Sequence, residues 1–156
     1  MLQMRRATRG DLEVIVAGNV TLAEETEQVK LDPATLREGV LALLEDRAPG
    51  RYWVAEQDGQ VVGQLLITYE WSDWRNRLVW WIQSVHVTEA ARRRGVFRAL
   101  YDFVRQEAQS AGAGGLRLYV HTDNTRAQAV YSALGMDGNH YRVFEDMFVE
   151  PEKVGH

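Results

Sequence analysis

The chain is 156 residues long, with 46% hydrophobic and 26% charged residues and a formal net charge of −4. This composition is typical of one globular domain with its own core, and the negative charge gives no general attraction to nucleic acid or anionic membranes. The absence of cysteine excludes disulfides, thiolate metal sites and cysteine nucleophiles.

The N-terminal residues predict a first strand, because Leu2–Arg6 alternates apolar and polar side chains. No apolar run follows the charges of this segment, as a signal peptide would require. The longest apolar run, Leu78–Ile82, is too short to span a bilayer. We therefore expect a cytoplasmic protein.

Two helices are predicted next. Thr8 is placed to cap a helix from Leu12 to about Val20, and the acidic segment Ala23–Glu27 lies within or just after its last turns. Asp32, followed by proline at the first helical position, begins a second helix. The apolar face of this second helix consists of Leu36, Val40, Leu43 and Leu44.

A hairpin and a long strand follow. Asp58–Gly59 lies between the alternating runs Tyr52–Glu56 and Val61–Glu70, and this dipeptide is a strong signal of a tight hairpin turn. After a polar and aromatic connection, Leu78–Val87 predicts a long strand. A bulge or a close backbone approach would be tolerated at Gly63, Gln83 and Ser84.

The chain is organised around Ser84–Leu100, which predicts a strand, a cationic loop and a helix N-terminus. The Arg92–Arg94 cluster and Gly95 mark the loop, and apolar residues then recur at helical spacing. Such a junction directs backbone N–H groups and the positive end of the helix dipole at one point, which suits a phosphate group. A solvated loop or a nucleic-acid patch would use the same residues, and the acidic net charge argues against the patch.

The remaining elements complete a mixed α/β sheet with helices on both faces. The helix after Gly95 runs to about Ala111, where a glycine-rich stretch breaks it, and Leu116–His121 predicts another strand. Asn124 leads into a short helix that Gly135 ends. We expect one or two strands within Met136–Val149, and one domain over residues 1–150 with a tail at 151–156.

Three motifs together resemble the GNAT superfamily of acyl-CoA-dependent N-acyltransferases over essentially the whole chain. The first is Arg92–Phe97, which resembles the family's (Gln/Arg)-x-x-Gly-x-(Gly/Ala) loop. The second is Asn124–Met136, which resembles Asn-x-x-Ala-x-x-x-Tyr-x-x-x-Gly-(Phe/Met). The third is the hairpin Ala55–Gly63. The resemblance implies a mostly antiparallel sheet that is splayed between its fourth and fifth strands.

The resemblance also implies a binding site for acetyl-CoA as acyl donor. The loop backbone from Arg93 to Arg98 would hold the pyrophosphate, and Asn124 would bind or position the cofactor arm. Tyr131 would lie near the sulfur and protonate the leaving thiolate. The implied cofactor-binding set is Val85, His86, Val87, Arg92, Arg93, Arg94, Gly95, Val96, Phe97, Arg98, Asn124, Ala127 and Tyr131.

Two residues depart from the family pattern. Phe97 stands where the family has Gly or Ala, although its N–H can still donate and its side chain can point into the core. Gln83 stands near a position where many members carry a carboxylate, and an amide cannot accept a proton from the amine. These departures leave open an alternative function, a noncatalytic acyl-CoA-binding sensor of the same fold.

The expected reaction is acetyl transfer to a primary amine by direct attack in a ternary complex. An alkylamine is mostly protonated at neutral pH, so a base is needed, and we favour Glu25 or a water near Glu70. The ordinary interpretation of the acidic segment is a solvated helix end. The ordinary interpretation of Tyr131 is an aromatic residue of the core. The expected acceptor-binding residues are Glu24, Glu25, Glu70, Trp71 and Gln83.

The sequence leaves the acceptor's identity open, between a small molecule and a protein residue. No two histidines have ligand spacing, so no metal is expected. His86 and His121 are interpreted as structural. Neither nucleic acid nor membrane is expected as a partner, and a homodimer stays open.

Overall fold

The computed structural model describes residues 1–151, so that only Pro151 of the expected tail falls within the described range. One five-stranded sheet has its strands in chain order, with β1 to β4 antiparallel and β5 parallel to β4. The strands are β1 (Leu2–Arg6), β2 (Gly50–Gln57), β3 (Gln60–Ser72), β4 (Arg77–Val87) and β5 (Leu116–Arg117).

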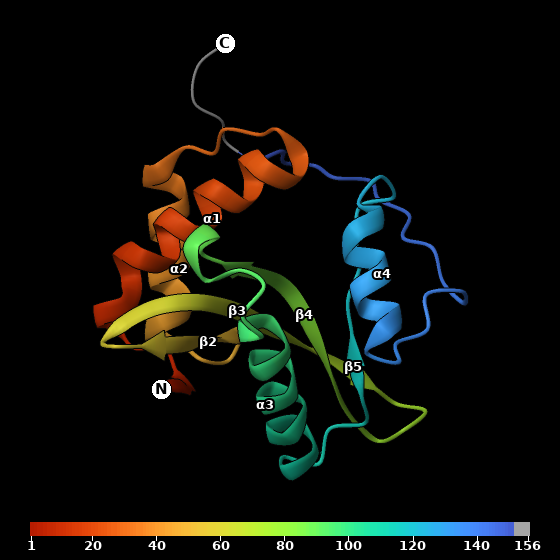
Figure 1. Cartoon of the computed structure of the whole chain (residues 1–156). Coiled ribbons are helices and arrows are strands. Elements are labelled where there is room, and N and C mark those ends of the chain that lie inside the picture. The colour runs from red at the N-terminus through yellow and green to blue at the C-terminus, as the bar shows by residue number, and fades with distance from the viewer. Residues whose placement is uncertain (152–156) are drawn as a thin grey trace.

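Helices cover both faces of this sheet (Figure 1). The helices are α1 (Leu12–Glu27), α2 (Pro33–Glu45), α3 (Val96–Ser110) and α4 (Thr125–Ala133), with short 3-10 turns at Arg9–Asp11 and Glu89–Ala91. One core cluster joins α1 and α2 to the sheet, and the other lies beneath α3. No helix in residues 1–151 has the length and apolar character needed to cross a membrane.

Local signals in the sequence account for the ends of several elements. The Asp32 carboxylate accepts a hydrogen bond from the Thr35 N–H at 3.2 Å, which caps α2 as expected. Asp58 and Gly59 have φ of 52° and 79°, the left-handed conformations that a two-residue hairpin turn requires. Thr8 precedes the first 3-10 turn rather than α1 itself, and the acidic segment forms the last turns of α1.

Two bulges interrupt the central strands, and both adjoin positions where the sequence suggested one. Ala55 pairs with Gly63 and Glu56 with Val61, which leaves Val62 as the extra residue of β3. On β4, the residues opposite Leu66 and Ile67 are Ser84 and Ile82, so Gln83 is unpaired between them. The second bulge turns the end of β4 away from its course.

The C-terminal third of the chain differs from the expectation. The strand expected at Leu116–His121 is only Leu116–Arg117, and the strands expected within Met136–Val149 are not formed. Val143, Phe144, Phe148 and Val149 are residue types that favour strands. Propensity alone does not make a strand, because each strand needs a neighbouring edge to accept its backbone hydrogen bonds.

Candidate active site

The sheet opens between β4 and β5. These strands pair only at Trp80 with Leu116 and at Trp81 with Arg117, and β4 continues for six residues beyond. The Thr88 N–H donates to Val62 O at 2.9 Å, toward β3. Because strand backbone groups alternate in direction, the N–H and C=O groups of Val85 and Val87 face the opening.

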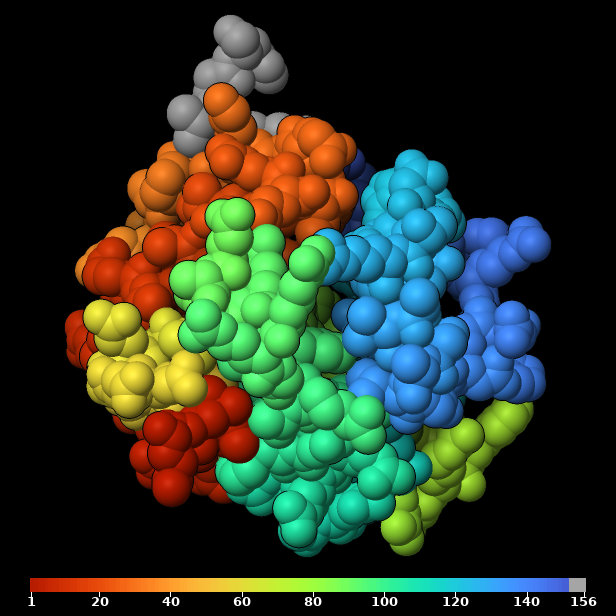
Figure 2. All heavy atoms as spheres, viewed as in Figure 1, coloured from red at the N-terminus to blue at the C-terminus, as the bar shows by residue number. Residues whose placement is uncertain are grey.

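The loop that follows β4 presents the uncapped N-terminus of α3 beside this opening. Arg93 and Gly95 have φ of 65° and 78°, and Gly95 is the N-cap residue without a side-chain cap. The first intrahelical bond runs from the Ala99 N–H to Gly95 O at 3.0 Å. The N–H groups of residues 96–98 therefore have no acceptor within the helix, and the positive end of the helix dipole lies with them. Figure 2 shows a hollow between this loop and α4.

Arg92 does not extend from the loop toward this hollow. Its Nε–H donates to Val87 O at 3.0 Å, and its terminal nitrogens donate to the Glu25 carboxylate at 2.7 and 3.2 Å. These hydrogen bonds lower the pKa of Glu25, although partial burial acts in the opposite direction. The pair therefore joins the last turns of α1 to the loop and makes Glu25 a weak base. Glu24, its neighbour on the helix, is exposed.

The other wall of the hollow is α4. The Asn124 Oδ1 accepts a hydrogen bond from the Ala127 N–H at 3.1 Å, which fixes the start of the helix. The Tyr131 ring contacts the Phe97 ring edge-on, with 6.0 Å between centroids. Phe97 also lies 6.3 Å from Tyr101, so its side chain joins α3 to α4 and leaves its own N–H at the helix N-terminus. Burial raises the pKa of Tyr131, which keeps the phenol protonated at neutral pH.

A polar and aromatic surface lies on the sheet face that carries α1, next to the opening. The Gln83 amide at the bulge donates to Thr68 Oγ1 at 2.8 Å, and Arg117 forms an ion pair with Glu70. Thr68 is directly opposite Trp81, whose ring centroid lies 6.0 Å from that of Tyr119. These six residues, Thr68, Glu70, Trp81, Gln83, Arg117 and Tyr119, are called the acceptor-side surface below.

The structure brings two of the expected acceptor residues, Glu70 and Gln83, together on this surface. Trp71 follows Glu70 on β3 and by alternation lies on the opposite face, where it is exposed. Thr68, Arg117 and Tyr119 belong to this surface although the sequence did not lead us to expect them there. The alternation of side chains along β3 would have predicted Thr68 beside Glu70. The positions of Arg117 and Tyr119 depend on the parallel register between β4 and β5.

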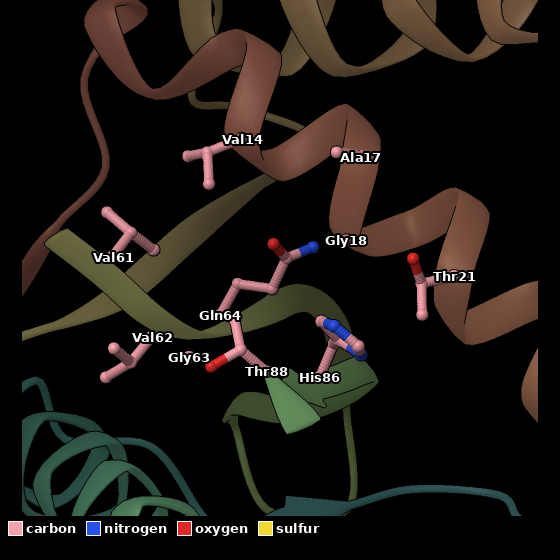
Figure 3. A pocket seen from close by; sticks show the side chains of 10 residues that line it. All are labelled: Val14, Ala17, Gly18, Thr21, Val61, Val62, Gly63, Gln64, His86 and Thr88. Carbon is pink, nitrogen blue, oxygen red and sulfur yellow. The ribbon is translucent and has the colours of Figure 1, made fainter. Parts of the chain in front are cut away.

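A separate small cavity, of about 150 Å³, lies between α1 and the ends of β3 and β4 (Figure 3). The Gln64 side chain points toward α1 and donates to Ile15 O at 3.2 Å, close against Gly18. His86 lines the same cavity, so its side chain turns toward α1 while its backbone stays in β4. Burial lowers the pKa of His86, as does nearby Arg92, against the opposing effect of Glu25. The cavity is too small for a nucleotide-sized ligand.

Residues 20–136 match the model of the acetyltransferase (GNAT) family. No curated protein matches this chain. Within residues 1–151, no group of three or more metal-ligating side chains is positioned to hold a metal ion.

Three solved structures give the scale of the similarity. A possible acetyltransferase from Clostridium difficile 630 is 39% identical with a TM-score of 0.90, over 96% of this chain and 99% of that one. A ribosomal-protein-alanine N-acetyltransferase from Brucella melitensis biovar Abortus 2308 is 15% identical, with a TM-score of 0.76, and the match covers 94% of this chain and 100% of that one. The aminoglycoside N-acetyltransferase AAC(6')-Iy, in complex with CoA, is 16% identical, with a TM-score of 0.78 over 96% of each chain. The last two share the fold alone.

Proposed function

Because this chain belongs to the acetyltransferase (GNAT) family, we propose that it transfers an acetyl group from acetyl-CoA to a primary amine by direct attack in a ternary complex. The observation that carries this proposal is the uncapped first turn of α3 beside the open edge of β4. One group of donors suits a diphosphate, and the other suits the amides of an extended pantetheine chain.

Each part of acetyl-CoA would be bound by the backbone groups that face it. The N–H groups of Val96, Phe97 and Arg98 would bind the pyrophosphate, with Arg93 and Arg94 adding charge from the loop. The N–H and C=O of Val85 and the N–H of Val87 would bind the pantetheine arm as an added strand, since Val87 O already accepts from Arg92. The side chains of Arg92 and Asn124 are engaged within the protein, so their roles would be to position the loop and α4.

The reaction requires a carbonyl that is polarised and a leaving thiolate that is protonated. Acetyl-CoA supplies the thioester, and a main-chain N–H at the open edge, near Val85, would stabilise the oxyanion as the amine nitrogen bonds to the carbonyl carbon. As the carbon–sulfur bond breaks, the Tyr131 hydroxyl would give its proton to the thiolate. Its raised pKa suits this role, because the phenol is protonated until that step.

The acceptor-side surface suits a cationic amine that carries an aromatic or aliphatic body. Glu70 provides a carboxylate, partly neutralised by Arg117, and the rings of Trp81 and Tyr119 provide a face for a cation or an apolar group. The proton of the ammonium would leave through a water beside Glu70. We prefer this water to Glu25, since Arg92 lowers the pKa of the Glu25 carboxyl.

Two measurements on the intact protein test the proposal. Calorimetry with acetyl-CoA should detect binding, and a panel of primary amines should give release of free CoA thiol that depends on the amine. Binding without release on any amine would favour the acyl-CoA sensor. Failure to bind acetyl-CoA or longer acyl-CoA esters would reject both functions.

A further inference from the structure

A cleft lies beneath the C-terminal end of α3, on the sheet face that this helix covers. Its volume is about 270 Å³, and side chains from β1, β2, β4 and α3 line it. Six residues of this lining define the α3-end cleft: Arg6, Arg51, Trp53, Trp80, Glu107 and Ser110. Since α3 has 15 residues, it is about 20 Å long, and that length separates the cleft from the uncapped N-terminus of the same helix. Figure 1 shows the C-terminal end of α3 on the side of the molecule away from α1.

Two arginine side chains of the cleft lie beside one indole ring. Arg6 is directly opposite Trp53 in the register of β1 and β2, and Arg51 is two residues before Trp53, so all three side chains share one face. The guanidinium carbon of each arginine lies 5.7 Å from the centroid of the Trp53 ring, so the two carbons are within twice that distance of each other. Neither guanidinium forms an ion pair with any carboxylate of residues 1–151. Positive charge is therefore concentrated around this ring.

Two N–H groups of the cleft residues are buried without an acceptor. They are Arg51 Nε and Trp53 Nε1, and no other buried side-chain nitrogen or oxygen in the described part of the chain lacks a partner. Trp53 is only 1% exposed. Because a buried donor without an acceptor is unfavourable and uncommon in folded proteins, these two groups indicate a ligand that supplies oxygen atoms.

A carboxylate lies in the same cleft. Glu107 is half-buried on α3 and forms no ion pair within residues 1–151. Ser110 is the last residue of α3, where the negative end of the helix dipole lies. The cleft thus has two regions: the guanidinium and indole donors suit a carboxylate, whereas Glu107 and the helix end suit an ammonium group.

We propose that the α3-end cleft binds a free acidic amino acid, a molecule with two carboxylates and one ammonium group at neutral pH. One carboxylate accepts hydrogen bonds from Arg51 Nε and Trp53 Nε1, the other faces the exposed Arg6, and the ammonium group lies toward Glu107. This ligand gives both buried donors an acceptor, and its charges are opposite in sign and equal in number to those of the three side chains. A phosphate ion would instead place a like charge against Glu107. The site lies apart from the proposed acetyl-transfer site and does not depend on it.

Calorimetry at neutral pH and low ionic strength, with L-glutamate, glutarate and inorganic phosphate, tests the proposal. Glutarate has both carboxylates of glutamate but no ammonium group. Glutamate should bind one per chain and more tightly than glutarate, and phosphate should bind more weakly than either. Absence of glutamate binding, or tighter binding of phosphate, would overturn the proposal. Equal affinity for glutamate and glutarate would overturn the role given to Glu107.

Substitutions determine whether glutamate binds in this cleft. Arg51→Met keeps an apolar chain on the indole ring and should weaken glutamate binding at least about tenfold, because charge-assisted hydrogen bonds are lost. The control Arg105→Met removes the same charge from an exposed position of α3 outside the cleft and should bind glutamate as the wild type does. Wild-type affinity in Arg51→Met would refute the site. If that variant does not fold, Arg6→Met, at an exposed residue, replaces it and must weaken binding as well.

The indole N–H signals in a proton–nitrogen NMR spectrum give a second measurement. Glutamate should shift the signal of Trp53, which Trp53→Phe assigns, and leave the signals of the exposed Trp71 and Trp74 in place. A shift of the Trp81 signal instead would place glutamate on the acceptor-side surface and overturn the proposal. Acetyl-CoA should bind equally well to Arg51→Met and to the wild type, because its proposed site is at the other end of α3.

Discussion

Replacement of Tyr131 by phenylalanine isolates the proposed proton donor. The ring that packs against Phe97 at 6.0 Å stays, and within residues 1–151 the hydroxyl makes no hydrogen bond that the change would break. Folding stability should therefore change little. General acid catalysis contributes about 10²-fold or more, so turnover should fall by roughly two orders of magnitude, or about 2.7 kcal/mol of transition-state stabilisation.

The assay is release of CoA thiol under saturating acetyl-CoA, with kcat and KM determined separately. The KM for acetyl-CoA should stay within about twofold, because the phenol acts in the transition state and not in ground-state binding. Tyr101→Phe is the matched control: it removes a hydroxyl from another tyrosine beside Phe97, and turnover should be unaffected. A Tyr131→Phe enzyme with wild-type turnover would refute the role.

Three further substitutions test the loop and the packing of the fold. Gly95→Ala should weaken acetyl-CoA binding in calorimetry, because a φ of 78° disfavours alanine and the loop would change its conformation. Gly59→Ala, at a φ of 79°, is the control. Each substitution should lower the free energy of unfolding by about 1–2 kcal/mol, but Gly59→Ala should leave acetyl-CoA binding intact. Gly18→Ala places a Cβ against the buried Gln64 amide, which would have to move and give up its hydrogen bond to Ile15 O, so urea unfolding should show a loss of about 1 kcal/mol, and an unchanged midpoint would contradict this. Burial pushes the pKa of Asp11 up, but hydrogen bonds from Arg5 and the nearby backbone outweigh it, so the pKa lies below 3.8. The stability that Asp11 contributes is thus present above its unfolded-state pKa and is lost as the pH falls through the lower folded-state pKa. Asp11→Asn should therefore make the decline of Tm below about pH 4 less steep. Thermal denaturation at a series of acidic pH values checks this.

Local signals in the sequence were sufficient for most elements up to α3. The hairpin turn at Asp58–Gly59, the cap at Asp32 and the turn at Gly95 each depend on the conformation of one or two residues. Such preferences act within a few residues and do not need the rest of the fold. The start of α4 at Asn124 was confirmed for the same reason.

Long-range contacts decided what these signals could not. The carboxylate expected to act as base, Glu25, is paired with Arg92, which is 67 positions away in sequence. The register between β3 and β4 determines that Gln83 is the unpaired residue of the bulge. No local preference fixes either contact, because each depends on where separate elements pack.

The sequence by itself determined the family, the order of helices and strands up to α4, and the loop that presents the α3 N-terminus, since turns, caps and apolar periodicity encode these locally. Only the tertiary structure decided that Arg92 turns back to α1, that Phe97 joins α3 to α4, and that residues 137–149 form no strand. A strand requires an edge to pair with, and a side chain's partner is set by the packing of whole elements, so neither can be read from the residues alone.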